Sequence, residues 1–460
     1  MAASQDPAFN QLLSRVVELS LNFTQALGDQ NIPLPTFAPD SPSQYDGLDA
    51  DLFVTRQQLL DNLMDLYYLV QGPSESIFNY VHNCMPDVAA LDVLNYFDFW
   101  SAVPLDGSAT YAEISNHTTL PTEVVERVIS HAKTLRIFAD VRPGDTRSPI
   151  RHSSRSAALA KSAGLRALVS TVLGDAGPPM TALPQALEKY SKGKQALPSD
   201  MTQTAFNLFH HGKYANSWEY IENDGEGEKK GWRSRNFTTF MAYLKDIFRL
   251  EEIVDSCYDW KAAGDLQVVD LGGSGGHDSF VLAKKYPNLR ITVEDLPKVQ
   301  SAFESNIPEE LQSRVTFLAH DFFQSQPVQA DLYLIKLILH DWPDKECIEI
   351  LRGLRPALKP GAKILFIDYV GKQDTAETGG NDGSNDTHEK AAPRASPLPR
   401  SIQQMGTSTD LRMMALFSTK ERPPGAWKDI FRTADERFDI VRFEANPLSF
   451  FVIIEVIWRE

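Results

Sequence analysis

The chain has 460 residues, of which 42% are hydrophobic, and its formal net charge is −16. This length is typical of two domains with sizeable apolar cores. The acidic balance argues against broad electrostatic binding to nucleic acid or to an anionic membrane surface.

The cysteines and the terminal sequence also limit the class of protein. Cys84, Cys257 and Cys347 are too widely spaced to form a disulfide framework or a metal-binding cluster. We therefore expect no metal ion and a reducing, cytoplasmic setting. We also expect neither a secretory signal nor a membrane span, because the N-terminus lacks a basic region and no apolar run is long enough.

The first half of the chain is predicted to be helical. Residues 1–50 read as a short helix followed by a proline-rich linker. Residues 51–81 carry apolar side chains at helical spacing, which indicates one long amphipathic helix that covers a core or a partner chain. We expect this helix to open a domain that extends over residues 51–200.

Residues 88–165 have the pattern of a winged helix-turn-helix, in which two helices precede two short strands. On its own this shape suggests DNA binding, with contacts from Arg127, His131, Lys133 and Arg136. The alternative is a dimerisation platform on which these charges form a solvated helix face. The acidic charge of the chain favours the platform. We therefore predict a homodimer formed through the N-terminal domain, without a nucleic-acid or membrane partner.

Residues 201–250 form a predicted helical connector with an unusual density of aromatic side chains. Such side chains either pack as a core or wall a pocket for a flat substrate. The sequence leaves both interpretations open.

Residues 251–460 alternate strands and helices, the pattern of a doubly wound α/β sheet. The expected strands are 267–271, 289–294, 315–319, 331–336, 362–369, 437–445 and 449–457. The link between the last two is too short for a crossover helix, so this pair must be antiparallel. Residues 372–404 interrupt the alternation with a polar insertion rich in glycine and proline, which we expect to be disordered.

A glycine-rich turn follows the first of these strands. Residues 270–276 read Asp-Leu-Gly-Gly-Ser-Gly-Gly and lead into a helical stretch. Gly272 and Gly273 allow the backbone to come close to a ligand. The spacing does not fit the dinucleotide pattern Gly-x-Gly-x-x-Gly. Together with Asp270 and the pair Glu294–Asp295 at the end of the next strand, the spacing of the glycines favours a compact adenosyl ligand. A tight turn without a ligand is the alternative.

A histidine follows the strand at 331–336. His340 lies just past the carboxyl end of that strand, on the edge where open α/β sheets bind ligands. An imidazole there can take a proton from a hydroxyl group at neutral pH. Two acids are candidates to orient it, namely Asp368 after the following strand and Glu421 past the insertion. The alternative for Glu421 is a solvated surface charge.

Asp321 and Phe322 follow the strand at 315–319. The carboxylate could accept a hydrogen bond from an adenine amine, with the phenyl ring packed against the base. The alternative for Phe322 is an ordinary core position.

In combination these motifs resemble the caffeic-acid-type O-methyltransferases, and in particular their fungal natural-product relatives. The resemblance runs from near Thr55 to the C-terminus, apart from the insertion. It rests on Asp-Leu-Gly-Gly at 270–273, Asp-Leu-Pro at 295–297, His-Asp-Phe-Phe at 320–323, Lys-x-x-x-His-Asp-Trp at 336–342 and Lys-Glu-Arg at 420–422. It implies an α/β, Rossmann-like, seven-stranded class I methyltransferase domain, preceded by a mostly α-helical winged-helix dimerisation domain.

The resemblance also implies roles for individual residues. His340 would be the general base, flanked by Asp368 and Glu421. Asp295 would bind the ribose of S-adenosylmethionine. The remaining cofactor contacts would be Asp270, Gly272, Gly273, Leu296, Asp321, Phe322 and Lys336, and the substrate contacts would be Trp342, Met413 and Met414. The implied reaction is in-line methylation of a hydroxylated aromatic or polyketide-type secondary metabolite, without a metal.

Some residues depart from the family pattern. Ser274 stands where the turn usually has glycine, Pro423 replaces the usual threonine, and Asp368 replaces a longer glutamate. One alternative is therefore a pericyclase or cyclase of the same fold, in which Lys336 and His340 would polarise a substrate carbonyl and the cofactor would not be consumed. A third hypothesis is a winged-helix DNA-binding regulator with a vestigial enzyme domain. The intact His340 favours methyl transfer.

Overall fold

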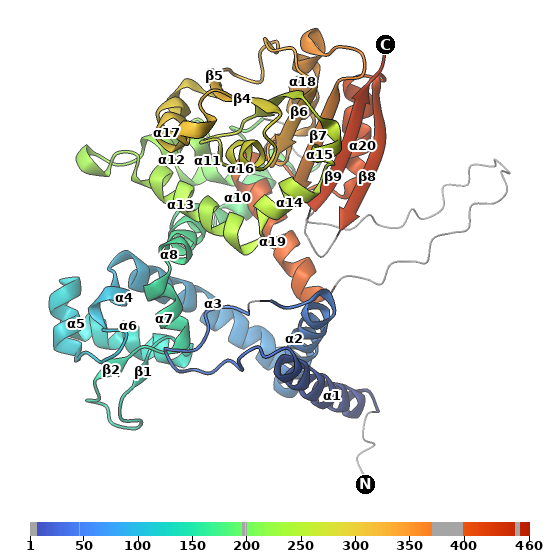
Figure 1. Ribbon diagram of the computed structural model, residues 1–460. Coiled ribbons are helices and arrows are strands. Elements are labelled where there is room, and N and C mark those ends of the chain that lie inside the picture. The colour runs from blue at the N-terminus through green and yellow to red at the C-terminus, as the bar shows by residue number, and fades with distance from the viewer. Residues whose placement is uncertain (1–6, 46, 196–197, 199, 370–398, 447–450) are drawn as a thin grey trace. The chain divides into compact units, whose positions relative to one another are not determined.

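The computed structural model describes residues 7–45, 47–195, 198, 200–369, 399–446 and 451–460 (Figure 1). The chain forms two compact units. The first comprises Met1–Pro178, Trp218–Leu244 and Pro399–Ile402, and the second comprises Pro179–Ser217, Lys245–Leu398 and Gln403–Glu460.

The first unit is mostly helical, as predicted. Its helices include α1 (Pro7–Asp29), α2 (Ala50–Gln71), α3 (Pro73–Tyr96), α4 (Phe99–Ala102), α5 (Tyr111–Thr118), α6 (Thr122–Thr134), α7 (Ser154–Lys161), α8 (Ala163–Val169) and most of α13 (Trp232–Ile247), with a π-helix at Ser170–Ala176. A short helix, α9 (Gly177–Met180), crosses into the second unit.

The segment predicted to be a winged helix-turn-helix contains α5, α6 and a short strand pair. A capping box starts α5: the Glu113 amide donates to the Thr110 hydroxyl, and the Thr110 amide donates to the Glu113 carboxylate. After α6, strands β1 (Ala139–Asp140) and β2 (Ile150–Arg151) pair antiparallel. The module encloses its own apolar core, which includes Trp100, Ile114, Ile129 and Phe138.

Two helix boundaries in this unit differ from the prediction. The single helix expected over residues 51–81 breaks at Gly72, where φ is 75°, and Pro73 opens α3. The apolar residues keep their helical spacing on both sides of the break, so this spacing gave no sign of it. The Gly72–Pro73 pair is the sequence feature that marks the break. The helix expected to be short, α1, runs as far as Asp29.

The second unit contains a seven-stranded sheet. Its strands are β3 (Leu266–Leu271), β4 (Leu289–Asp295), β5 (Val315–Ala319), β6 (Leu332–Lys336), β7 (Lys363–Tyr369), β8 (Phe438–Asn446) and β9 (Phe451–Trp458). Their order is β5-β4-β3-β6-β7-β9-β8. Only the pairs β7–β9 and β8–β9 are antiparallel. All seven predicted strands and the terminal antiparallel pair are therefore confirmed. The strand order reverses between β3 and β6, the kind of position where open α/β sheets hold ligands.

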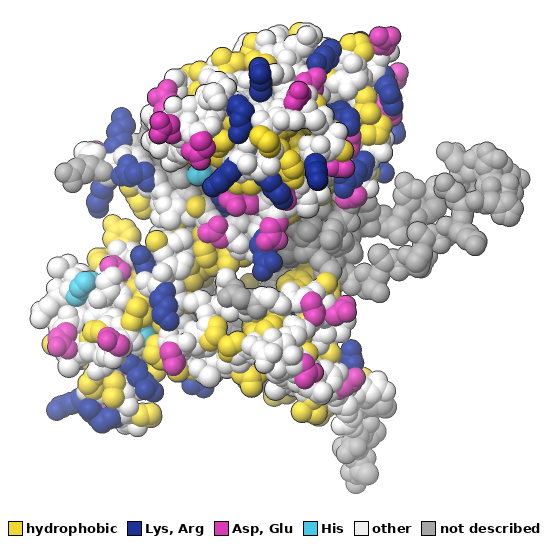
Figure 2. Space-filling model, in the orientation of Figure 1, with side chains coloured by type: hydrophobic (Ala, Val, Ile, Leu, Met, Phe, Trp, Pro, Cys, Tyr) yellow, Lys and Arg dark blue, Asp and Glu magenta, His cyan; other side chains and the backbone are white. Residues whose placement is uncertain are grey.

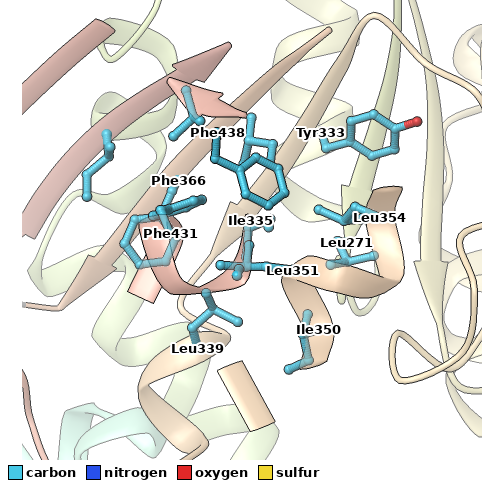
Figure 3. Close-up of a cluster of buried hydrophobic side chains, with 14 of the residues drawn as sticks. Leu271, Tyr333, Ile335, Leu339, Ile350, Leu351, Leu354, Phe366, Phe431 and Phe438 are labelled. Atoms are coloured by element: carbon cyan, nitrogen blue, oxygen red, sulfur yellow. The ribbon is translucent and has the colours of Figure 1, made fainter. Parts of the chain in front are cut away.

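Helices cover both faces of this sheet. Tyr333 and Ile335 of β6 pack with α18 (Asp344–Leu354) and α20 (Pro424–Ala434), as Figure 3 shows for Leu351 and Phe431. Leu334 points to the opposite face, where it packs in the cluster of α14 (Leu250–Ser256) and α16 (His277–Lys285). Burial on both faces explains why these strands read as continuous apolar runs.

The remaining helices are α10 (Leu183–Tyr190), α11 (Ala205–Phe209), α12 (Ser217–Asn223), α15 (Trp260–Ala263), α17 (Gln300–Asn306) and α19 (Arg400–Phe417). Most of the predicted insertion, residues 370–398, lies outside the described residues. Its predicted end at residue 404 was wrong, because α19 begins at Arg400. The Asp61 carboxylate accepts the amides of Arg400 (2.6 Å) and Ser401 (2.8 Å) and so caps α19 from a distant part of the sequence.

Candidate active site

Three strand ends meet at one edge of the sheet. Residues 270 and 271 of β3 pair with residues 334 and 335 of β6, and Lys336 of β6 pairs with Ile367 of β7. Because these strands are parallel, the segments that follow them lie together at the carboxyl edge. These segments are the glycine turn, the His340 segment and Asp368.

Backbone hydrogen bonds and close packing against neighbouring side chains fix the shape of the glycine turn. The amides of Gly272 and Gly273 donate to the carbonyl of Glu294, at 2.8 and 3.2 Å. Gly272 has a φ of 70°, and a Cβ there would lie 2.6 Å from Ile338 Cδ1. At Gly273 a Cβ would lie 2.6 Å from the Asp270 carboxyl carbon. Any larger residue would therefore displace the turn.

Ser274 adopts the left-handed conformation that its family position usually gives to glycine, with a φ of 50°. Its amide donates to Asp295 Oδ2 at 2.9 Å, and this bond offsets part of the strain. Asp295 Oδ1 accepts the amide of Leu296 at 2.7 Å. Each carboxylate oxygen keeps a lone pair for a further donor. Burial raises the pKa of Asp295 above its ordinary value.

Two acids lie on the α16 side of the turn. Asp270 is buried and accepts the Ser279 hydroxyl at 2.6 Å. Burial, reinforced by the nearby Asp278 charge, raises the pKa of Asp270 to about 7. Asp278 forms an ion pair with Lys336 through Oδ2, while its Oδ1 is buried without a hydrogen bond to any described residue. Asp278 and Ser279 were not among the predicted site residues, because only the fold brings them beneath the turn.

The predicted adenine contacts follow β5. The Asp321 side chain accepts the Phe323 amide at 3.0 Å. The Phe322 ring lies edge-on to Trp342, with centroids 5.9 Å apart, and packs against the core cluster. Trp342 also contacts the ring of Phe323.

His340 is surrounded by carboxylates. Its Nδ1 lies 3.5 Å from Glu421 Oε1, and its Nε2 lies 3.7 Å from Asp341 Oδ1. Asp368 accepts the backbone amide of His340 at 3.2 Å, so it holds the main chain while Glu421 faces the ring. Asp341 was not predicted, although it directly follows the histidine. Of the two acids proposed to orient the imidazole, only Glu421 lies within hydrogen-bonding reach of a ring nitrogen.

These carboxylates control the charge of the imidazole. Burial disfavours the imidazolium, but the negative charges of Asp341, Asp368 and Glu421 outweigh burial and raise the pKa of His340 to about 10. Burial raises the pKa of Asp368 to about 6, against the opposing effect of the His340 charge. The structure therefore favours a charged imidazolium at neutral pH in the free protein.

Arg422 fixes the Glu421 segment to the His340 segment. Its fully buried guanidinium donates to the Trp342 carbonyl (2.7 Å), the Leu339 carbonyl (3.4 Å) and Asp344 Oδ1 (2.7 Å). It also lies over the Trp427 ring, 4.7 Å from the centroid. Leu339 and Trp342 flank His340 and Asp341 in the chain, so this clamp determines how Glu421 meets the imidazole.

Helix α19 brings further residues to the site. Asp410 accepts the Glu421 amide at 2.8 Å, and the Thr419 amide donates to the Met413 carbonyl at 3.4 Å. The Met413 side chain is buried and that of Met414 is half-buried. The part of α19 that carries both methionines is therefore joined to the segment that carries Glu421.

The described part of the chain holds no group of three or more side chains suited to a metal ion. Among the same residues, no helix is both long and apolar enough to cross a membrane.

Comparisons with known proteins show the family of this chain. Residues 208–386 match the model of the O-methyltransferase domain family. The O-methyltransferase lcsG of Purpureocillium lilacinum is 39% identical over 458 residues, which cover 98% of this chain and 94% of lcsG. Two solved structures, described as LepI in complex with SAM and as a pericyclic reaction enzyme, each have a TM-score of 0.67 and 20% identity. In both cases the match covers 97% of this chain and 100% of the other.

The sheet order and its carboxyl edge thus define a class I methyltransferase fold. The two solved structures are 20% identical to this chain, so their similarity establishes the fold alone. The relative that is 39% identical establishes more. This chain belongs to the O-methyltransferase family, in its fungal natural-product branch, and is an S-adenosylmethionine-dependent enzyme.

Replacing Arg422 tests the clamp. Arg422→Met should lower the free energy of unfolding by about 3 kcal/mol. This loss is somewhat smaller than the loss expected on breaking a fully buried ion pair, because Asp344 is 49% exposed. Thermal unfolding followed by circular dichroism measures the loss. The matched control is Arg432→Met, which removes an exposed arginine paired with Asp429 and should cost less than about 0.5 kcal/mol. Equal melting temperatures for the two variants would contradict the clamp.

Proposed function

We propose that this enzyme methylates a hydroxyl group of an aromatic or polyketide-type secondary metabolite, with His340 as the general base. The observation that carries the proposal is the position of this imidazole. It lies at the switch-point edge of the sheet, with Glu421 3.5 Å from one ring nitrogen and Asp341 3.7 Å from the other. The curated relative lcsG, an O-methyltransferase, supports the same reaction.

The residues at the glycine turn fit S-adenosylmethionine. Gly272 and Gly273 let the backbone turn tightly against Ile338 and Asp270, and Asp295 keeps acceptor capacity for two ribose hydroxyls. Asp270 supports the turn from within, and Lys336 is held beside it by Asp278. We assign Leu296, Asp321 and Phe322 to the adenosine side. Bound there, the cofactor supplies an electrophilic methyl group on a sulfonium.

The residues around His340 move and hold one proton. A neutral imidazole that donates from Nδ1 to Glu421 leaves Nε2 free to accept the substrate hydroxyl proton. Asp341, which faces Nε2, then stabilises the imidazolium together with Glu421. Asp368 keeps the backbone of this segment in place. Nε2 would accept the hydroxyl proton and later release it to solvent, and a cofactor held at the glycine turn would supply the methyl group to the oxygen, with its carbon–sulfur bond broken and S-adenosylhomocysteine as the leaving product.

We assign the substrate side to Met413 and Met414 on α19, with Trp342 bordering the adenosine side. The thioether side chains are flexible and polarizable, so they can adapt to the outline of a flat ring. Aromatic packing of Trp342 against Phe323, with centroids 4.7 Å apart, would keep the pocket wall rigid.

Replacing His340 tests the proposed base. His340→Ala should lower the rate of methyl transfer at least about a hundredfold, because the hydroxyl loses its proton acceptor. Mass spectrometry with a deuterated-methyl cofactor and a panel of phenolic polyketides measures the transfer, and calorimetry should show unchanged binding of S-adenosylhomocysteine. Loss of water or rearrangement of a substrate without a mass gain would instead support a pericyclase. Full activity of the variant would contradict the proposal.

The pH dependence of kcat/KM tests the carboxylates. The pKa of His340 is raised to about 10, so the free enzyme must lose a proton before it can act as a base, and kcat/KM should rise with pH through the neutral range. Glu421→Gln removes one negative charge, lowers this pKa and should shift the rise to lower pH. The control Lys420→Met, at an exposed ion pair, should leave the profile in place. A shift to higher pH in Glu421→Gln would refute this account.

We further propose that the enzyme is a homodimer formed through its N-terminal helices. Large apolar side chains are exposed along α2 and α3, in the region where Figure 2 shows hydrophobic groups gathered. They include Tyr67 (57% exposed), Val70 (69%), Ile77 (65%), Phe78 (63%), Tyr80 (68%) and Val81 (66%). A contiguous patch of this kind marks an interface in a folded protein.

Sedimentation tests the dimer. The wild-type protein should have twice the mass of one chain, and the double variant Phe78→Glu/Val81→Glu should be monomeric, because charges would replace the apolar contact. Val124→Glu, on an exposed valine of α6, is the matched control and should leave the mass unchanged. A monomeric wild-type protein would rule out the dimer.

The cysteines support the proposed cytoplasmic location. Cys84, Cys257 and Cys347 are all free thiols, and the last two are buried. An oxidising compartment offers no advantage to a protein without disulfide bonds.

A further inference from the structure

Asp278 differs from the other two aspartates at the glycine turn. Its Oδ2 forms the ion pair with Lys336, but its Oδ1 is buried and has no hydrogen-bond partner among the described residues. Asp295, in contrast, accepts a backbone amide through each of its oxygens, and Asp270 accepts the Ser279 hydroxyl. A buried carboxylate oxygen without a donor is costly, because nothing replaces the hydrogen bonds that it made to water. A donor from a bound ligand would remove this cost.

The ion pair of Asp278 joins two segments of the ligand-binding edge. Asp278 lies in the first turn of α16, just after Gly276 ends the glycine turn. Lys336 is the last residue of β6, which neighbours β3 where the strand order reverses. The carboxylate therefore lies where the segment that follows β3 meets the end of β6, and open α/β sheets hold their ligands at such a position.

The charge at this position suits a cationic group. Asp270, Asp278 and Asp295 are three acids near one another, and the Lys336 ammonium pairs with only one of their oxygens. The crowding of acids also affects Asp270, because burial and then the charge of Asp278 raise its pKa to about 7. A positive charge brought by a ligand would relieve this repulsion, whereas a further negative charge would increase it.

We propose that Asp278 Oδ1 accepts a hydrogen bond from the α-ammonium group of S-adenosylmethionine, so that this residue recognises the amino-acid end of the cofactor. The inference rests on the placement of the cofactor at the glycine turn in the proposed function. An ammonium group carries both the hydrogen-bond donors and the positive charge that the buried oxygen lacks. Hydrogen bonds between an ionised donor and an ionised acceptor are also stronger than neutral ones.

Calorimetry on the full-length protein with two matched ligands tests this contact. S-adenosylhomocysteine carries the α-ammonium group, and its desamino analogue has hydrogen in the same place. The wild-type protein should bind S-adenosylhomocysteine about tenfold or more tightly than the analogue, as expected for a charge-assisted hydrogen bond. Asp278→Asn keeps the size of the side chain and an oxygen that can accept from Lys336. This variant should bind the two ligands with nearly equal affinity.

A second ion pair of α16 supplies the control. Lys285, the last residue of the helix, pairs with Asp255 at 2.5 Å. Asp255→Asn removes the same kind of charge at the opposite end of α16 and should keep the wild-type preference. The ligand 5′-methylthioadenosine lacks the whole amino-acid portion. It should bind the wild type and Asp278→Asn equally well, which would show that the variant keeps a folded adenosine site.

The outcomes separate this contact from the proposed function. Equal affinity of the wild type for S-adenosylhomocysteine and its desamino analogue, or an unchanged preference in Asp278→Asn, would overturn the inference. An equal loss of affinity for all three ligands in Asp278→Asn would also overturn it, because Asp278 would then act only through Lys336 and the turn.

Two further results concern the proposed function. Absence of heat for every ligand with the wild type would overturn the placement of the cofactor, and this inference with it. A wild-type protein that shows the preference for the ammonium group but methylates no phenolic substrate would support the contact and count against the proposed function alone.

Discussion

The parallel alignment of β3, β6 and β7 is the constraint on which the site depends. These strands end in register, so a glycine turn, a histidine and an aspartate from distant parts of the sequence reach the same edge. Helices bury both faces of the strands, which prevents a register slip, because a shift by one residue would turn each apolar face toward the wrong helices. The chemistry therefore rests on the packing of an ordinary α/β core.

Charge at this edge is arranged in two groups. Three carboxylates surround His340, and a second set, Asp270, Asp278 and Asp295, lies at the glycine turn with Lys336 as its cation. The negative charge around His340 stabilises its imidazolium.

The sequence predicted the sheet well, because strands buried on both faces leave apolar runs bounded by glycine and proline. It also predicted that Glu421 would lie near His340, and the two side chains are 3.5 Å apart in the structure. It did not predict that Asp368 holds a backbone amide, that Arg422 is the clamp, or that Asp61 starts α19. Those contacts join residues 28, 83 and 339 positions apart in the chain, and no local periodicity records such distances. The break at Gly72 was missed because the helical pattern continued on both sides.

The central claim is that the sulfonium of the cofactor lies between the glycine turn and His340. A crystal structure of the protein with S-adenosylhomocysteine tests it most directly. The account predicts that the sulfur faces His340 Nε2, with room between them for the transferred methyl group and one hydroxyl oxygen, which would lie about 3 Å from Nε2. A sulfur directed away from His340, or an imidazole ring turned out of the site, would contradict it.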